Sequence, residues 1–209
     1  MSEPLRIFNG QGRPQLGADQ MAALTVLAAA VRDLVEATLL TDVDPATLLA
    51  TAEAVNALVP GLDAVRRAAP PVADLDGNGV LRQLASPVSG RLNPIAPPIE
   101  IVALPDGTVR SEFTLSPVYE GPPGCVHGGM SAMILDHVAG AAAAFNGTPG
   151  MTATLEMRYR RPTPHSVPLV AEARTDRVEG RKTFVEARIT DLDGRTTVEA
   201  TGMFVLPSR

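Results

Sequence analysis

The segment between Tyr119 and Asp136 holds the residue types in this chain that could do chemistry. It places His127, Gly128 and Gly129 directly before an apolar stretch that contains a single carboxylate, Asp136. If this stretch is a helix, its first amides have no intrahelical acceptor, and glycines let a ligand oxygen approach them closely. The positive end of the helix dipole adds to this effect. The pattern therefore predicts a site for a carbonyl that is becoming an oxyanion.

Asp136 is the second candidate group. An acidic side chain in an otherwise apolar helix is costly to bury unless it is paired or protonated. Such a carboxylate is typical of a nucleophile or a general base. It could instead point to solvent at a sheet edge or cap a loop, but the glycines nearby favour the catalytic interpretation.

The spacing of these groups predicts a site shared between two chains. Gly129 and Asp136 are seven residues apart, which is ~10.5 Å along a helix axis and nearly two turns, so both lie on one face. A single carbonyl hardly spans that gap, because each group must lie within ~3 Å of the reacting atoms. Two such helices running antiparallel across a dimer would bring the glycine turn of one chain to the aspartate of the other. We therefore expect the monomer to be inactive.

The remaining histidines and the cysteine have simpler interpretations. His127 could be a general base, although beside two glycines a role in holding the loop is favoured. His137 points about 100° away from Asp136 around the helix, which favours packing or an interface. His165 lies in a turn bounded by prolines and is expected to be exposed. Cys125 has no base at a spacing suited to a nucleophile.

The elements that position these residues can be predicted from hydrophobic periodicity. Helical spacing runs from Leu16 to about Val59 and is interrupted after Thr41, with a second helix from Asp44-Pro45 through Ala57. A third short helix is possible around residues 63–68. The stretch from residue 69 to 98 is rich in proline, which is typical of a linker or an irregular arm. Residues 130–145 form a helix that is apolar nearly all round, which indicates burial.

The C-terminal half alternates like strands. Residues 99–104 and 108–115 form a hairpin around an Asp-Gly turn, and four strands follow at 151–161, 167–177, 183–191 and 196–205. The predicted fold is therefore α+β, a curved antiparallel sheet wrapped around one buried helix. We expect a helical region at 1–68, a Pro-rich linker at 69–91 and the sheet domain at 92–209.

Composition excludes several classes of protein. The 209 residues carry a net charge of −5, which argues against nucleic-acid binding. The single cysteine and three histidines leave little material for a metal site, so no metal or cofactor is expected. Residues 74–79 imitate the start of a calcium loop, but its twelfth position is Ala85, so a turn is favoured. No signal peptide or membrane span is predicted, and we expect a cytoplasmic protein.

Several segments of this chain, taken together, resemble those of one known protein family. The run His127-Gly128-Gly129, followed by Asp136, by 151–155 (MTATL) and by 159–162 (YRRP), resembles the hotdog-fold acyl-CoA thioesterases. The likeness covers about residues 92–206 and is greatest to the PaaI-like branch that includes the THEM-type thioesterases. It implies the hotdog fold, acyl-CoA as substrate and assembly as a homodimer or a dimer of dimers with composite active sites.

The resemblance also implies roles for individual residues. The amide of Gly128 or Gly129 would polarise the thioester carbonyl, and Asp136 would act as nucleophile or general base from the neighbouring subunit. Thr152 would position water or the carboxylate, and His127 would orient the turn. Several relatives carry Asn where this chain has Gly121, so one side-chain polariser is missing.

Contacts to the rest of the substrate are less determined. Arg158, Arg160 and Arg161 suit the phosphates of coenzyme A, or they form a solvated strand face, and both interpretations stay open. Met133 is expected to line an acyl tunnel or the core. The alternative from another class is a non-catalytic acyl-CoA-binding or regulatory hotdog protein, with the helical N-terminus as an interaction module. A hydratase on the same fold is less favoured, because such enzymes usually pair a histidine with an acid.

Overall fold

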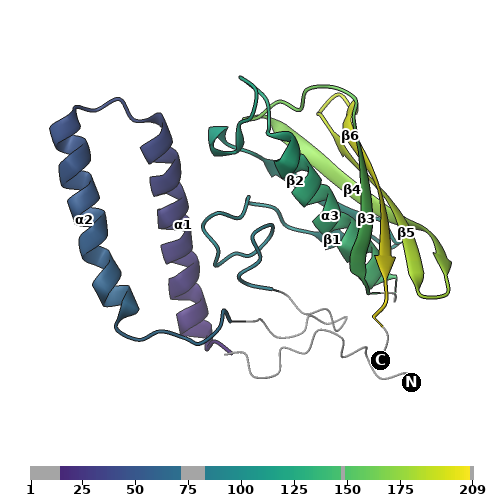
Figure 1. Cartoon of the computed structure of the whole chain (residues 1–209), viewed down its shortest axis with the longest axis horizontal. Coiled ribbons are helices and arrows are strands. Elements are labelled where there is room, and N and C mark those ends of the chain that lie inside the picture. Colours follow the sequence, from purple (N-terminus) through teal and green to yellow (C-terminus); the bar gives the residue numbers. More distant parts are fainter. Residues whose placement is uncertain (1–14, 72–82, 147–148, 208–209) are drawn as a thin grey trace.

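A computed structural model of the protein describes residues 15–71, 83–146 and 149–207. The turn expected at residues 74–79 and the middle of the linker expected at 69–91, residues 72–82, lie outside these ranges. The described part contains α-helices, one 3-10 helix and a single sheet (Figure 1). Their bounds are α1 Ala18–Leu40, α2 Pro45–Asp63, β1 Val102–Ala103, β2 Val109–Thr114, η2 Pro117–Tyr119, α3 Gly128–Phe145, β3 Met151–Tyr159, β4 Pro168–Glu179, β5 Lys182–Thr190 and β6 Thr196–Val205.

The two N-terminal helices form a hairpin. Asp44 caps α2, since its carboxylate accepts hydrogen bonds from the amides of Ala46 and Thr47, and Pro45 occupies the first helical position as predicted. α2 ends at Asp63 and not at Ala57, and it includes Pro60. The expected helix at residues 63–68 is wrong: the residues after Asp63 are not helical. A segment that short is costly to nucleate, and the prolines at 70 and 71 disfavour helix just before them.

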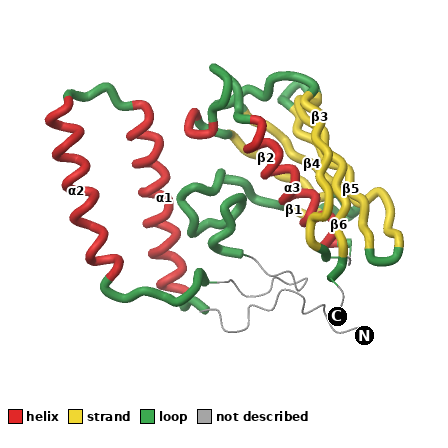
Figure 2. Tube along the Cα trace, viewed as in Figure 1, coloured by secondary structure: helices red, strands yellow, loops and turns green. Residues whose placement is uncertain are grey.

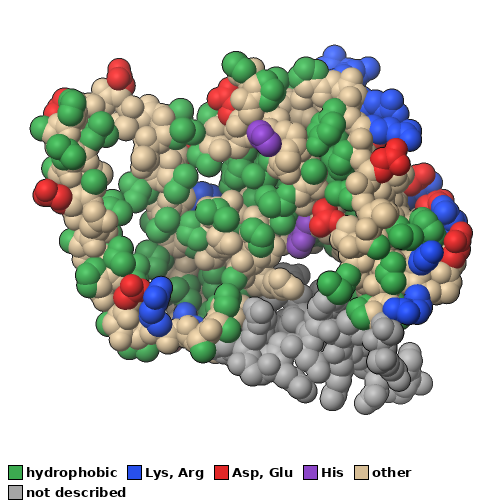
Figure 3. Space-filling model, viewed as in Figure 1, with side chains coloured by type: hydrophobic (Ala, Val, Ile, Leu, Met, Phe, Trp, Pro, Cys, Tyr) green, Lys and Arg blue, Asp and Glu red, His purple; other side chains and the backbone are tan. Residues whose placement is uncertain are grey.

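The hairpin leaves much apolar surface uncovered within one chain. α2 buries no residue, and Leu49, Leu58 and Leu62 are each more than half exposed. Figure 3 shows hydrophobic side chains along both helices with few charged ones among them. α1 lies between α2 and the rest of the molecule (Figures 1 and 2), and Arg32 anchors it by donating to the carbonyls of Asn93 and Ala96.

All the described strands belong to one antiparallel sheet, in the order β1-β2-β4-β5-β6-β3. The turns between neighbours are made by glycines with positive φ: Gly107 (84°), Gly180 (58°) and Gly194 (73°). β3 comes directly after α3 in the chain and lies at the edge of the sheet, paired only with β6 among the described residues. Its outer edge is therefore free to pair with another strand.

The core lies between α3 and the inner face of the sheet. α3 packs on β4, β5 and β6, and Ile134, Leu135 and Val138 on the helix are fully buried. The sheet contributes alternate residues, such as Val185 and Ile189 of β5. This arrangement confirms the predicted curved antiparallel sheet around one buried helix.

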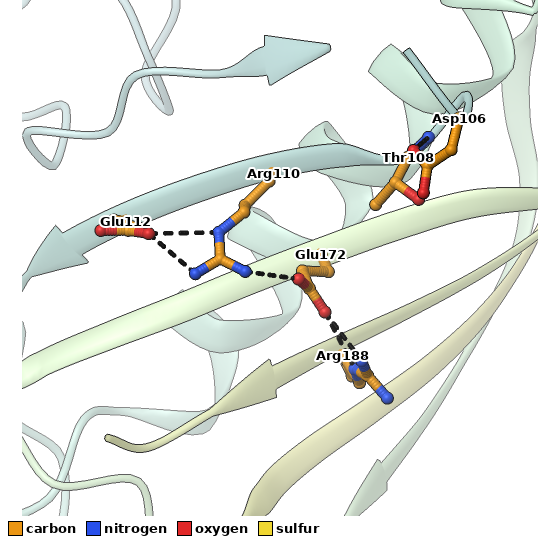
Figure 4. A network of polar contacts seen from close by, with 6 residues as sticks. All are labelled: Asp106, Thr108, Arg110, Glu112, Glu172 and Arg188. Carbon is orange, nitrogen blue, oxygen red and sulfur yellow. Dashed lines mark hydrogen bonds and ion pairs between the residues drawn. The ribbon is translucent and has the colours of Figure 1, made fainter. Parts of the chain in front are cut away.

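The outer face of the sheet carries a row of alternating charges. Cross-strand partners run Arg110, Glu172, Arg188, Glu199 and Arg158, from β2 through β4, β5 and β6 to β3. Glu172 accepts 2.8 Å hydrogen bonds from both Arg110 and Arg188 (Figure 4). The hydrogen bond from Arg188, with a smaller contribution from Arg110, holds the pKa of Glu172 below its ordinary value. Opposite charges placed across neighbouring strands stabilise the sheet.

Candidate active site

The first turn of α3 leaves one amide without an acceptor. His127 is the N-cap, and its Nδ1 accepts a 3.0 Å hydrogen bond from the amide of Gly129. Its carbonyl accepts from the amides of Met130 and Ser131. Within the described ranges, the amide of Gly128 has no intrachain acceptor. Gly128, and not Gly129, is therefore the donor available to a ligand at the positive end of the helix.

His127 thus holds the turn, which agrees with the favoured interpretation from the sequence. Its Nδ1 serves as an acceptor, so the cap requires this nitrogen to be unprotonated. A Cβ added at Gly129 would lie 3.1 Å from the same atom, so the imidazole packs closely over that glycine. Gly129 leaves room for the imidazole of the cap, whereas Gly128 presents the donor.

The loop before α3 is also tightly held. Glu120 accepts a 2.6 Å hydrogen bond from the amide of Gly124, whose φ is +77°. The amide of Gly121 donates to the carbonyl of Cys125. A Cβ at Gly121 would lie 2.7 Å from Cα of His127, so any side chain there requires the backbone to shift. The chain therefore has no room for an asparagine at this position as the loop stands.

Tyr159 is a site residue that the sequence did not single out. It is the last residue of β3, and its hydroxyl donates a 2.9 Å hydrogen bond to the carbonyl of Gly128. Its ring lies against Gly128, where an added Cβ would approach Cε1 to 3.2 Å. The signal available in the sequence was the strand alternation, which puts Tyr159 on the same face as Leu155 and Met157, the face toward α3.

Asp136 and Thr152 form the second part of the site. Asp136 is half-buried on α3, and its Oδ1 accepts a 2.8 Å hydrogen bond from the Thr152 hydroxyl. The pairing of β3 with β6 shifts register between Thr152 and Thr154. Such an irregularity bends a strand and re-aims its side chains. The pair that the resemblance implied is therefore in hydrogen-bond contact within one chain.

The structure does not bring the two parts together in a single chain. Gly128 and Asp136 are both on α3, and their spacing corresponds to ~12 Å along the axis at ~1.5 Å per residue. β3 contacts both, through Tyr159 at its end and Thr152 near its start. One strand thus fixes two groups that are too far apart to act on one carbonyl.

The three arginines differ in their partners. Arg158 pairs with Glu156 and Arg160 with Glu199, each within 3.0 Å. Both side chains lie on the outer face of the sheet, away from Tyr159 and α3. Arg161 follows the strand, and its guanidinium has no acidic partner among the described residues. The outer-face position favours the solvated interpretation for Arg158 and Arg160, which leaves Arg161 as the one of these three arginines without an acidic partner in the described part of the chain.

The remaining candidates, Met133, His137 and His165, have side chains that are partly or largely buried. Met133 is partly buried and packs against the core. His137 is largely buried and its Nε2 lies 2.7 Å from Oγ of Ser89. Burial lowers the pKa of His137, although Asp136 acts in the opposite direction. The expectation that His165 is exposed is wrong, since its side chain is 16% exposed and contacts Ser166 and Glu120.

The described residues hold neither a candidate metal centre nor a membrane-spanning helix. They contain no group of three or more His, Cys, Asp or Glu that could hold a metal ion. None of their helices has both the length and the apolar character needed to cross a bilayer.

Comparison with known proteins gives the family context of this geometry. The sequence model of the Thioesterase superfamily matches residues 123–198, which include α3 and Asp136. The acyl-coenzyme A thioesterase THEM4 of Xenopus laevis is 35% identical over 94 residues, covering 44% of this chain and 42% of that protein. THEM4 of Mus musculus is 39% identical over 87 residues, covering 41% and 37%. The matched region thus spans about two fifths of the length of these curated relatives.

Solved structures extend the likeness to nearly the whole chain. A crystal structure described as a thioesterase superfamily protein is 41% identical, with a TM-score of 0.80, and covers 92% of this chain and 97% of its own. Zebra fish thioesterase superfamily member 2 is 20% identical with a TM-score of 0.52, covering 59% and 91%, and it shares the fold. On the identity and coverage of the first of these structures, the chain belongs to the thioesterase superfamily.

Proposed function

We propose that this protein hydrolyses acyl-CoA thioesters, converting a thioester and water into a carboxylic acid and the free thiol of coenzyme A. The observation that carries the proposal is the Gly128 amide, which has no acceptor among the described residues and lies on the same helix as the Asp136–Thr152 pair. One group suits a developing oxyanion and the other suits the attack on its carbon. The curated relatives named acyl-coenzyme A thioesterase support this choice of substrate class.

The active site is composite in this proposal. A second copy pairs along the free edge of β3, so that the two α3 helices lie side by side and antiparallel. Gly128 of one chain then faces Asp136 of the other, which removes the ~12 Å separation within one chain. The free edge supports this assembly, since a nine-residue edge strand is a ready template for pairing. A homodimer is the smallest assembly that completes the site, and a dimer of dimers contains the same unit.

The chemistry follows from the two groups. The Gly128 amide binds the thioester oxygen as negative charge develops on it. Thr152 holds Oδ1 of Asp136, which leaves Oδ2 to remove a proton from water as the water oxygen bonds to the carbonyl carbon. Collapse of the oxyanion breaks the carbon–sulfur bond, and the thiolate takes up a proton. If Asp136 attacks directly, the carbon–sulfur bond breaks as a mixed anhydride forms, and the coenzyme A thiolate leaves and takes up a proton. Water then hydrolyses the anhydride, which releases the carboxylic acid and restores the Asp136 carboxylate.

The rest of the substrate contacts fewer groups. We assign Arg161 to the phosphates of coenzyme A, because its guanidinium has no acidic partner in the described part of the chain and follows the strand that ends at Tyr159. Met133, partly buried on α3, lines the path of the acyl chain. A cytoplasmic site of action fits the single cysteine, which allows no internal disulfide.

Thiol release from a panel of acyl-CoAs of increasing chain length tests the activity. We expect turnover by the wild-type chain and a loss of about 10²- to 10⁴-fold in kcat in Asp136→Asn and Asp136→Ala. Both variants keep their circular dichroism spectrum and oligomeric mass, because Asp136 is only half-buried. Turnover retained in either variant removes Asp136 from the mechanism.

The second candidate function is binding of acyl-CoA without hydrolysis. The close approach of Gly121 to His127 favours it, since this chain has no room for a side-chain polariser in the loop. The same panel separates the two functions. Saturable binding of an acyl-CoA with no release of thiol, at any chain length, supports the binding protein and contradicts the thioesterase.

A further inference from the structure

We propose that Tyr159 is a positioning residue that holds the oxyanion donor in place, an inference that rests on the proposed thioesterase function. The starting observation is the 2.9 Å hydrogen bond from its hydroxyl to the carbonyl of Gly128. Tyr159 belongs to β3, whereas Gly128 begins α3, so this contact ties the edge strand to the mouth of the helix.

Two hydrogen bonds hold opposite ends of the same peptide unit. Tyr159 donates to the carbonyl of Gly128, and the amide of Gly129, which belongs to the same peptide plane, donates to Nδ1 of His127. Hydrogen bonds arranged in series through one peptide polarise and strengthen one another. The unit is therefore fixed by a strand on one side and by the N-cap on the other.

The neighbouring peptide unit is held at one end only. The carbonyl of His127 accepts from the amides of Met130 and Ser131, while the Gly128 amide at its other end is left for the substrate. Gly128 joins the two units, and a glycine adopts many backbone conformations at little cost. The carbonyl of Gly128 already takes part in the intrahelical hydrogen bonds of α3. Tyr159 adds a second restraint on this carbonyl from outside the helix, and so limits how far the first turn can reorient.

The ring of Tyr159 supports the same role. It packs against Gly128 so closely that a Cβ there would lie 3.2 Å from Cε1 and 3.4 Å from the hydroxyl oxygen. The side chain is 55% exposed, so it adds little to the core. Tyr159 buries little surface, but both its ring and its hydroxyl contact Gly128. Its side chain is therefore suited to orienting the donor glycine and not to packing in the core.

The chain offers a matched control, because it contains only one other tyrosine. Tyr119 also donates from its hydroxyl to a backbone carbonyl, that of Ile95, at 3.3 Å. Tyr159→Phe and Tyr119→Phe therefore delete the same kind of hydrogen bond, one beside the donor and one elsewhere. Burial raises the pKa of the Tyr119 hydroxyl, so this control residue keeps its proton near pH 7.

The test combines kinetics with amide exchange. We expect Tyr159→Phe to lower kcat about 5- to 20-fold with KM changed less than twofold, since a donor held only for the transition state affects kcat. Hydrogen exchange at the Gly129 amide should be faster in Tyr159→Phe and unchanged in Tyr119→Phe.

The outcomes separate this inference from the proposed function. A kcat within twofold of wild type in Tyr159→Phe, or an equal fall in Tyr119→Phe, overturns the positioning role. If the wild-type chain hydrolyses no acyl-CoA, the proposed function fails, and the exchange experiment alone decides whether Tyr159 restrains the turn. Unchanged exchange at Gly129 in Tyr159→Phe also overturns it.

Discussion

At the scale of single residues, two neighbouring glycine amides at the start of α3 have different partners. Gly129 donates to its own N-cap histidine, whereas Gly128 has no acceptor within the described chain. The difference is set by His127, whose extended backbone (φ −59°, ψ 133°) places Nδ1 over Gly129. The chemistry proposed for the site therefore depends on one amide, and this amide can be removed by a single substitution.

Gly128→Pro removes the amide hydrogen, and we expect the fold to tolerate it. Proline is favoured at the first helical position, and the backbone of His127 already has the extended conformation that precedes proline. Gly128→Ala is the matched control, because its Cβ makes the same 3.2 Å approach to Tyr159 but the amide is kept. We expect kcat of the proline variant to be about 10²- to 10³-fold below that of the alanine variant.

Thermal unfolding of the two variants completes this comparison. Similar midpoints with different kcat values assign the loss to the missing donor. Equal kcat values in the two variants would show that another group binds the oxyanion.

At the scale of elements, β3 connects the parts of the site. It carries Thr152, which holds Asp136, and Tyr159, which holds Gly128. The bounds of α1, the start of α2 and most strand bounds could be predicted from periodicity, because burial on one face leaves a pattern of 3.6 or 2 residues. The end of α2 could not, since this helix buries no residue that would mark its extent. The strand order could not, since no pattern along β3 states that it pairs with β6 at the far edge. The shift that aims Thr152 is equally invisible, because it depends on register with a partner strand.

Contacts between distant segments leave no pattern in the sequence, and this explains which candidate site residues could be predicted. Asp136 stands out as a charge within an apolar helix, and the glycines stand out by their place before it. Tyr159 looks like any aromatic residue near the end of a strand, and its contact depends on how β3 crosses α3. The choice between Gly128 and Gly129 depends on a side-chain rotamer of His127 that spacing does not encode.

His137 on α3 allows a prediction of how the stability of the fold depends on pH. Burial lowers the pKa of His137, whose Nε2 contacts Ser89, below its ordinary value of 6.5. Below about pH 6.5 the unfolded chain therefore binds a proton that the folded chain does not, so the free energy of unfolding falls until the folded pKa is passed. We expect thermal midpoints of the wild-type chain to drop more between pH 7 and pH 5 than those of His137→Gln.

His165→Gln is the control for this experiment, because it keeps His137 and so keeps the drop. The thermal midpoints of His137→Gln and wild type could instead fall equally between pH 7 and pH 5. His137 would then be protonated equally in the folded and unfolded chains, and its buried contact with Ser89 would not oppose its charge.

At the scale of the whole molecule, one chain holds two half-sites of different composition. The Gly128 half includes His127 and Tyr159, and the Asp136 half includes Thr152. In the proposed dimer, pairing of two copies along β3 around a twofold axis would join the Gly128 half of each chain to the Asp136 half of the other. Each such dimer would have two complete sites, and neither would belong to one chain.

Hybrid dimers test this arrangement directly. In a dimer of one Asp136→Asn chain and one Gly128→Pro chain, one site has both defects and the other has none. Each parent homodimer is inactive or nearly so, yet the hybrid should recover about half of the wild-type activity per dimer. Co-expression of the two chains with different affinity tags and two-step purification isolates the hybrid for the thiol-release assay.

A hybrid of Asp136→Asn with Asp136→Ala distinguishes sharing of a site from a general benefit of mixing. Both of its sites lack the carboxylate, so it should stay as inactive as its parents. If the Asp136→Asn and Gly128→Pro hybrid is equally inactive, both groups act within one chain. The ~12 Å between them along α3 would then have to be closed by a rearrangement of the helix, because no single carbonyl can contact both groups as α3 stands. Recovery of activity would require no such movement, since the proposed pairing along β3 would place the two groups on opposite sides of one substrate.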